Sequence, residues 1–380
     1  MGIPPDGFVQ HFTTGRTSEI EALRAKLDHK GPDAVLLQAN YGSGKSHLLR
    51  FIREAALQLG YAVSTVSLDA GAAVRFNRMD QILGAICRGI CVPGKGDPGI
   101  RSFLDHVCHS LATDPQHEFW RDVTHDGKWD YSEALRSPAM FTALRAWEAG
   151  GDDIHDFVAD WLSQPWQFRT QRKRLYTQLV YRLQASFTDP RSEKHFYKNE
   201  VFGFHQLDYR QTWDALADIH LLAVESGLKG LVVLFDEFED VIVNLNNISF
   251  QEEAFFNLFR FCSGSVFPGL TAYAVTPEFA SKCKTLLLAK GKWEFSYSRF
   301  EKIPTFRMSP LTTEDLLSLA PRVATTHGLA YGWKPELAAD YRTLMKSEIV
   351  RVSSVPVQDR ARQTIKAIVG TLDLLLEAGQ

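Results

Sequence analysis

The sequence has few cysteines, and they lack the spacing of a metal site or a redox motif. Five occur in 380 residues, at positions 87, 91, 108, 262 and 283, and no two form a C-x-x-C pair. An odd, scattered set predicts reduced and buried thiols, not disulfides or zinc ligands. Cys87 and Cys91 are four residues apart in an apolar segment, where core packing is favoured over a metal pair.

The chain also lacks a long apolar run, an export signal and a strong charge of one sign. No stretch of about 18 apolar residues occurs, so we expect no membrane span. Residues 1–6 do not show the basic-then-apolar pattern of a secretory signal, which favours a cytoplasmic location. A net charge of −3 argues against nucleic-acid binding over the whole surface but leaves a local patch open.

A glycine loop between an apolar strand and a helix is the most informative feature present. Residues 33–39 predict a buried strand, and residues 45–59 place apolar side chains on one helical face. The loop between them ends in Gly-Lys-Ser, the layout of a phosphate-binding P-loop. Lys45 would reach the β- and γ-phosphates of a nucleotide, and the Ser46 hydroxyl would hold Mg²⁺.

The loop departs from the full G-x-x-x-x-G-K-[ST] pattern at one position, where Ala39 replaces the first glycine. Alanine is small, so the loop remains compatible with close approach of an anion. Its backbone N–H groups and the positive end of the following helix would bind phosphate. The residues predicted to contact the nucleotide here are Ala39, Asn40, Tyr41, Gly42, Ser43, Gly44, Lys45, Ser46 and His47.

A second apolar strand ends in adjacent acids, as in the Walker B segment of an ATPase. Residues 230–235 are apolar after the leading glycine, and Asp236 and Glu237 follow. Asp236 would hold Mg²⁺ through water, and Glu237 would polarise the attacking water. A parallel strand that merely ends in acids is the alternative. Glu239 and Asp240 are expected to be solvated or structural rather than catalytic.

A further strand at 270–276 ends in Thr276 before a proline. In ATPases with a strand inserted between the P-loop and Walker B strands, this is the sensor 1 position, where Thr276 would bind the γ-phosphate or the water. A plain strand-terminal threonine is the alternative. A last strand is expected at 303–308, and Thr312 with Asp315 predicts a capping box at the next helix.

The order of these parts resembles AAA+ and STAND-type ATPases. Residues 12–19 are similar to the Gly-Arg-x-x-Glu box that precedes the first strand in origin-recognition and STAND ATPases, which implies that Arg16 lines the adenine side. A salt-bridged helix cap is the alternative. Residues 298–300, Ser-Arg-Phe, resemble the Ser-Arg-Cys arginine-finger motif of clamp-loader ATPases. That likeness implies that Arg299 contacts a nucleotide in the neighbouring subunit; a locally paired surface arginine is the alternative.

Three segments resemble the ATP-binding proteins of BREX phage-defence systems more closely. They are residues 215–239, the loop at 41–49 and residues 361–373, where Ala361 replaces a proline of the family's Pro-Arg-x-Phe-Leu segment. The resemblance implies that Arg362 is a sensor 2 arginine reaching the γ-phosphate. It also implies a role in anti-phage defence, with a helicase or another defence protein as partner.

The long segment 78–225 between the second strand and the Walker B strand shows a mostly helical pattern. Its first part is acidic between residues 114 and 161, and residues 166–200 are basic with interleaved aromatics. Solvated helix faces over an aromatic core, docking between subunits, and DNA binding through 166–200 all fit this pattern. The basic residues are Arg169, Arg172, Lys173, Arg174, Arg182, Arg191, Lys194 and Lys198, and the aromatics are Tyr176, Tyr181, Phe196 and Tyr197.

Together these features predict an α/β P-loop NTPase of the ASCE or AAA+ kind, with a parallel sheet, a helical insertion and a helical lid. The expected divisions are 1–77 and 226–308 for the core, 78–225 for the insertion and 309–380 for the lid. The expected activity is Mg²⁺-dependent ATP hydrolysis in a homo-oligomer with nucleotide at its interfaces, driving remodelling of DNA or a partner. A STAND-type switch with slow turnover and a DNA-bound loader or transposition regulator remain alternatives.

Overall fold

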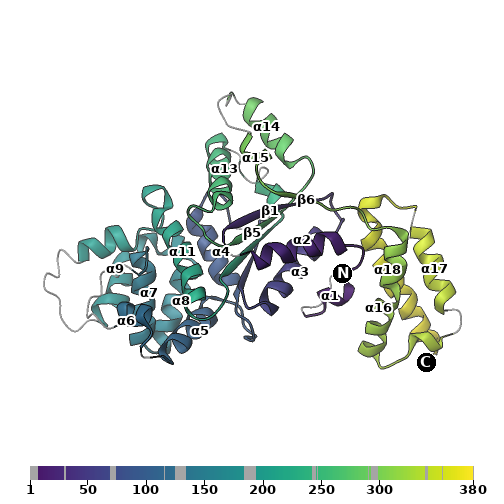
Figure 1. The fold of residues 1–380 in the computed structure, drawn as a ribbon, viewed down its shortest axis with the longest axis horizontal. Helices are drawn as coiled ribbons and strands as arrows, with labels where there is room; N and C mark the ends of the chain where they lie inside the picture. The colour runs from purple at the N-terminus through teal and green to yellow at the C-terminus, as the bar shows by residue number, and fades with distance from the viewer. Residues whose placement is uncertain are drawn as a thin grey trace.

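A six-stranded sheet lies at the centre of the computed structural model, with strand order β3–β2–β4–β5–β1–β6 (Figure 1). The structure describes residues 7–29, 31–68, 74–114, 116–124, 134–183, 194–241, 245, 247–289, 291, 298–338, 341–352 and 354–379. The strands are β1 (Asp33–Gln38), β2 (Ala62–Ser67), β3 (Ile90–Cys91), β4 (Leu231–Asp236), β5 (Leu270–Val275) and β6 (Thr305–Arg307).

Both faces of the sheet are buried at β1, β2, β4 and β5, because residues of these strands alternate between two apolar clusters. Val232 and Leu234 pack in one cluster with Ile52 of the helix α3 (Lys45–Gln58). Val233 and Phe235 pack in the other cluster, which extends through the helical segment between β2 and β4. Strands covered on both faces read as continuous apolar runs, which is why β4 and β5 are recognisable in the sequence.

The strand order confirms that β5 lies between the strand before the glycine loop and the acidic strand. β5 pairs in parallel with β1 on one side and with β4 on the other. β2 and β6 extend the parallel array, and the short β3 pairs antiparallel with β2. The carboxyl ends of β1, β4 and β5 therefore meet at one edge of the sheet, where ligands bind in open α/β sheets.

Helices cover the sheet and extend away from it on the left, on the right and above it in the view of Figure 1. Those preceding β4 are α1 (Val9–Phe12), α2 (Thr17–Asp28), α3 (Lys45–Gln58), α4 (Met79–Gly89), α5 (Ile100–Ala112), α6 (Glu118–Thr124), α7 (Pro138–Ala149), α8 (Asp152–Ser163), η1 (Pro165–Thr170), α9 (Arg172–Leu175), η2 (Tyr176–Tyr181), η3 (Tyr197–Val201), η4 (Leu207–Tyr209) and α11 (Arg210–Glu225). Those between β4 and β6 are η5 (Phe238–Asp240), α13 (Ile248–Ser263), α14 (Phe279–Ala289) and α15 (Ser298–Glu301).

The last helices form a separate group beside the sheet, at the opposite end of the molecule from α6 to α9 (Figure 1). They are α16 (Thr313–Tyr331), η6 (Pro335–Leu337), α17 (Tyr341–Val352) and α18 (Val357–Gly379), and they share their own apolar cluster. Thr312 and Asp315 form the expected capping box at the start of α16. In the part of the chain that the structure describes, no helix is long and apolar enough to cross a membrane.

His220 on α11 connects the helical segment to the start of β4. Its Nδ1 accepts a hydrogen bond from the Leu231 N–H at 3.2 Å. Its ring lies so close to Gly230 that a Cβ there would come within 2.5 Å of it. Burial lowers the pKa of His220 from 6.5 to about 4, so the ring is neutral and able to accept this bond.

Acidification is therefore expected to destabilise the fold through His220. His220 is protonated below about pH 6.5 in the unfolded chain but only below about pH 4 in the folded chain. The unfolded state therefore binds more protons in this window, and the free energy of unfolding falls as the pH drops through it. His220→Asn keeps an acceptor but does not titrate. The free energy of unfolding, measured with urea at pH 7 and at pH 5, should fall by about 2 kcal/mol more in the wild type than in this variant. Equal losses in the two proteins would contradict the assignment.

Candidate nucleotide site

The glycine loop (residues 39–46) connects β1 to the N-terminus of α3 at the carboxyl edge of the sheet. Gly42 and Gly44 have φ values of 74° and 93°, a left-handed conformation that side chains with a Cβ rarely adopt. The Leu48 N–H donates to the Gly44 carbonyl at 3.0 Å, so the helix begins directly at the loop. These two glycines let the chain turn tightly and expose backbone N–H groups at the positive end of α3.

Lys45 is folded back into this loop rather than extended into solvent. Its side chain is buried, and its Nζ donates to the Ala39 carbonyl at 3.0 Å. The same Nζ lies 3.2 Å from Glu239 Oε1 and 4.8 Å from the centre of the Tyr41 ring. The ammonium group is thus held against the loop by contacts within the chain, and its role toward phosphate stays a prediction.

The end of β4 carries the two acids that the sequence predicts, in different environments. Asp236 is half-buried, and its Oδ1 accepts a hydrogen bond from the Glu237 N–H at 2.9 Å. Glu237 is exposed and has φ 54° and ψ 35°, a left-handed conformation that is uncommon for a residue other than glycine. Strained backbone of this kind gathers at functional sites, where the surrounding structure holds it in place.

Glu239 is the acid that faces the glycine loop, and sequence analysis did not assign it a role there. It is only 7% exposed and pairs with Lys45. Glu239 lies in η5, the short 3₁₀ turn that begins directly after β4 and the left-handed Glu237. Its position just beyond the acidic strand end is the signal that could have identified it.

Thr276 follows the last residue of β5, next to the beginning of the glycine loop. The Ala39 N–H donates to the Val275 carbonyl at 3.1 Å, which joins the two strand ends. The Thr276 side chain is 3% exposed, and its hydroxyl has no hydrogen-bond partner among the residues that the structure describes. A buried hydroxyl without a partner is costly, so this group is suited to a ligand.

The oxygen donors at this edge fit a magnesium ion bound together with phosphate. Ser46 provides a hydroxyl at the exposed start of α3, and Asp236 provides a carboxylate at the end of β4. The described residues contain no group of three or more His, Cys, Asp or Glu that could hold a metal alone. Mg²⁺ is commonly held by one or two protein oxygens plus waters and substrate phosphates, so this small donor set suits it.

Arg16 and His47 connect the glycine loop to the N-terminal strap (residues 11–16). Arg16 is buried and donates to the Ser43 carbonyl at 2.9 Å, to the Ser309 carbonyl and to Glu19. His47 Nε2 lies 2.9 Å from the Thr13 hydroxyl. Burial, with the nearby cations Arg16 and Arg50, lowers the pKa of His47 to about 4. Arg16 thus holds the loop backbone at Ser43, whereas His47 joins the start of α3 to the strap, and the role of both toward a nucleotide stays a prediction.

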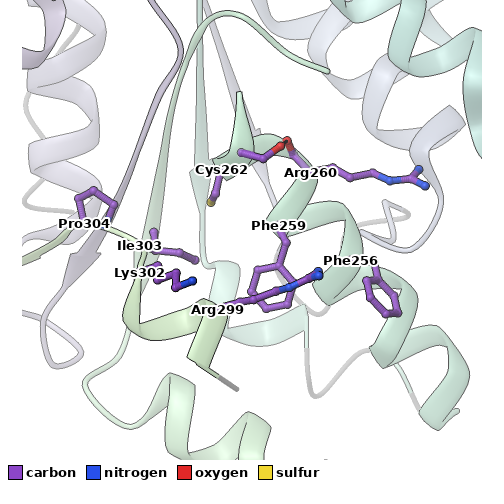
Figure 2. Close-up of a pocket in the computed structure, with 9 residues that line it drawn as sticks. Phe256, Phe259, Arg260, Cys262, Arg299, Lys302, Ile303 and Pro304 are labelled. Atoms are coloured by element: carbon purple, nitrogen blue, oxygen red, sulfur yellow. Dashed lines mark hydrogen bonds between the residues drawn. The ribbon is translucent and has the colours of Figure 1, made fainter. Parts of the chain in front are cut away.

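Arg299 lies away from this edge, on α15 just before β6. β6 runs parallel to β1, so the chain enters β6 from the edge of the sheet opposite the glycine loop. Arg299 borders a cavity of about 550 Å³, and its guanidinium lies 5.5 Å from the centre of the Phe259 ring. Figure 2 shows the arginine side chain extending across that ring, with Lys302 and Ile303 nearby. Arg299 is therefore not placed to reach the site of its own chain.

Arg362 is exposed on α18, within the C-terminal helical group. In the described part of the chain it makes no hydrogen bond, and the structure does not bring it to the glycine loop. The structure thus gathers Lys45, Asp236 and Thr276 at one edge of the sheet. It does not bring Arg299 or Arg362 to that edge.

The basic segment 166–200 is partly occupied by interactions within the chain. Tyr176 and Tyr197 are buried in the core. Arg169 pairs with the fully buried Asp80 at 3.5 Å, and Arg182 pairs with Asp153 of the acidic segment at 2.7 Å. These contacts favour helix faces over an aromatic core. Residues 184–193, including Arg191, lie outside the described residues, and DNA binding by this segment stays a prediction.

A mostly parallel α/β sheet with a glycine loop and an acidic strand end at one edge defines a nucleotide-binding protein. The chain belongs to the family of the BREX system ATP-binding protein BrxC/D, whose family model matches residues 1–380. It is therefore an ATP-binding protein of the BREX anti-phage system, as the sequence resemblance implied. No curated protein matches the chain, and no solved structure does.

Proposed function

We propose that this chain is an AAA+-like P-loop ATPase that hydrolyses ATP with Mg²⁺ to drive assembly or remodelling of DNA or a partner enzyme. The observation that carries the proposal is the strand order. With β5 between β1 and β4, the glycine loop, Asp236 and Thr276 all lie at one edge of the sheet. An adjacent acid pair at that edge suits attack by water, because one carboxylate can serve the metal and the other the water.

Each residue at this edge has a defined task in the proposed reaction. The glycine loop and Lys45 bind the phosphates, and Ser46 and Asp236 hold Mg²⁺, which when bound neutralises charge on the phosphoryl oxygens. Glu237 is exposed beside Asp236 and accepts a proton from the attacking water. The buried Thr276 hydroxyl donates to the γ-phosphate or to the water.

Contacts between the N-terminal strap and α16 support a link from the nucleotide to the lid. Arg322 of α16 donates to the His11 and Thr13 carbonyls at 2.9 and 3.0 Å. The Thr13 hydroxyl in turn meets His47 of α3, and Arg16 connects the Ser43 carbonyl to Ser309. Nucleotide binding that shifts the glycine loop would therefore act on the helical group that carries Arg362.

The position of Arg299 supports a role in a neighbouring subunit. It lies at the sheet edge opposite its own glycine loop, beside the cavity with Phe259 and Lys302. An arginine that completes a partner's site stabilises charge on the transferring phosphoryl group and raises turnover strongly. The proposed assembly is a homo-oligomer with nucleotide at its interfaces. The helicase or other defence protein that it would serve, and contact with DNA through 166–200, are part of the same proposal.

ATP turnover per subunit is expected to rise with protein concentration, because Arg299 reaches a site only when subunits assemble. Steady-state turnover should be measured across a concentration series with mass determined in parallel, in the presence and absence of single- and double-stranded DNA. DNA that raises turnover in a salt-sensitive manner would support DNA coupling. Tight nucleotide binding with negligible turnover under all conditions would instead favour the slow switch.

A mixing experiment separates action between subunits from a local role of Arg299. Arg299→Ala protein keeps its own glycine loop, and Lys45→Met protein keeps its Arg299. Each should hydrolyse ATP poorly alone, whereas a mixture should partly recover, because some interfaces combine an intact loop with an intact arginine. Absence of any recovery would contradict a role between subunits.

A further inference from the structure

The ion pair between Lys45 and Glu239 joins the lysine of the glycine loop to a carboxylate that follows a different strand. Nζ and Oε1 are 3.2 Å apart, and the two side chains are 9% and 7% exposed. An ammonium group has three N–H donors. Here Nζ also donates to the Ala39 carbonyl and faces the Tyr41 ring. The cation that should bind phosphate is thus already surrounded.

Phosphate oxygens and the Glu239 carboxylate would compete for the same cation. Two anions beside one buried ammonium group repel each other in a region where water screens little. The Ala39 carbonyl is neutral and can remain in place, but the carboxylate must give way or be partly displaced. Separating Lys45 from Glu239 then offsets part of the favourable free energy of ATP binding.

We infer that Glu239 is an internal counter-ion of Lys45, which the phosphates of a nucleotide displace and which thereby limits nucleotide affinity. The inference rests on the proposed function, because it takes Lys45 as the phosphate-binding lysine. Glu239 is a positioning residue in this account. It lies on η5, whose first residue directly follows the strained Glu237 that is the proposed base.

The test is the affinity for ATP in the presence of EDTA, where binding is measured by calorimetry without hydrolysis. Glu239→Gln keeps the shape of the side chain but removes its charge. The ammonium group of Lys45 is then less stabilised in the nucleotide-free protein than it is in the wild type. ATP supplies the missing negative charge, and its Kd should fall about tenfold or more. Damage to the fold would weaken binding, so a tighter Kd cannot arise from a merely structural role.

Glu278→Gln is the matched control for this measurement. Glu278 is exposed just after Thr276 near the same edge of the sheet, and it makes no ion pair among the described residues. The substitution changes the net charge of the protein by the same amount without touching Lys45. Its Kd for ATP should equal that of the wild type.

The possible failures are distinguishable by including Lys45→Met. A Kd for Glu239→Gln that is unchanged or weaker, while Lys45→Met loses binding, overturns the counter-ion and leaves the proposed ATPase standing. Binding by Lys45→Met as tight as wild type overturns both, because the phosphates then do not meet Lys45. If Glu239→Gln folds poorly, its stability cost is compared in the wild-type and Lys45→Met backgrounds. If Glu239→Gln lowers the free energy of unfolding by the same amount in both backgrounds, Lys45 and Glu239 do not interact, and the inference is overturned.

Discussion

Lys45→Met protein is expected to lose measurable ATP binding and to turn over ATP about a hundredfold more slowly or worse. The methionine side chain approximates the volume of lysine but has no charge to place against the phosphates. Lysine also stabilises transition-state charge on the γ-phosphoryl oxygens, so turnover should fall as well as binding. Calorimetry with ATP and a steady-state phosphate-release assay check the two effects separately.

Loss of folding must be separated from loss of the phosphate contact in this variant. Lys45→Met removes the cation of a buried ion pair with Glu239, and breaking such a pair from one side typically costs about 3–5 kcal/mol. The double variant Lys45→Met/Glu239→Gln removes both charges and should recover most of that stability. It should still fail to bind ATP. A double variant that binds and hydrolyses ATP normally would contradict the role of Lys45.

The sheet and the main parts of the site could be predicted because their signals are local. β1, β4 and β5 are buried on both faces and therefore appear as apolar runs. The glycine loop is a continuous motif, and Asp236 and Thr276 stand at strand ends that topology brings to one edge. The position of β5 followed from the order of motifs, without knowledge of side-chain packing.

The contacts around these parts could not be predicted, because they join residues far apart in the chain. Lys45 and Glu239 meet only after β4 has paired into the sheet. Arg16 reaches a carbonyl of the glycine loop and another just before α16, which no local pattern specifies. The aromatics of 166–200 were open to several interpretations until the structure showed Tyr176 and Tyr197 in the core.

Glu237→Gln protein is expected to bind ATP with near-normal affinity and to lose most of its turnover, by about a hundredfold or more. Glu237 is exposed, and Lys45 pairs with Glu239, so the charge of Glu237 should matter little for holding the phosphates. Glutamine cannot accept the proton of the attacking water. The measurement is the Kd for ATP in EDTA together with the maximal rate of phosphate release in Mg²⁺.

Comparison of Glu237→Gln with Glu239→Gln identifies which acid acts on the water. The structure gives the two carboxylates opposite environments, one exposed beside Asp236 and one buried against Lys45. If Glu237 is the base, its variant separates binding from turnover, whereas the Glu239 variant mainly changes affinity. Normal turnover in Glu237→Gln with abolished turnover in Glu239→Gln would transfer the base to Glu239. In that case the left-handed backbone conformation of Glu237 would orient the η5 turn that carries Glu239, and the Glu237 carboxylate itself would not act on the water.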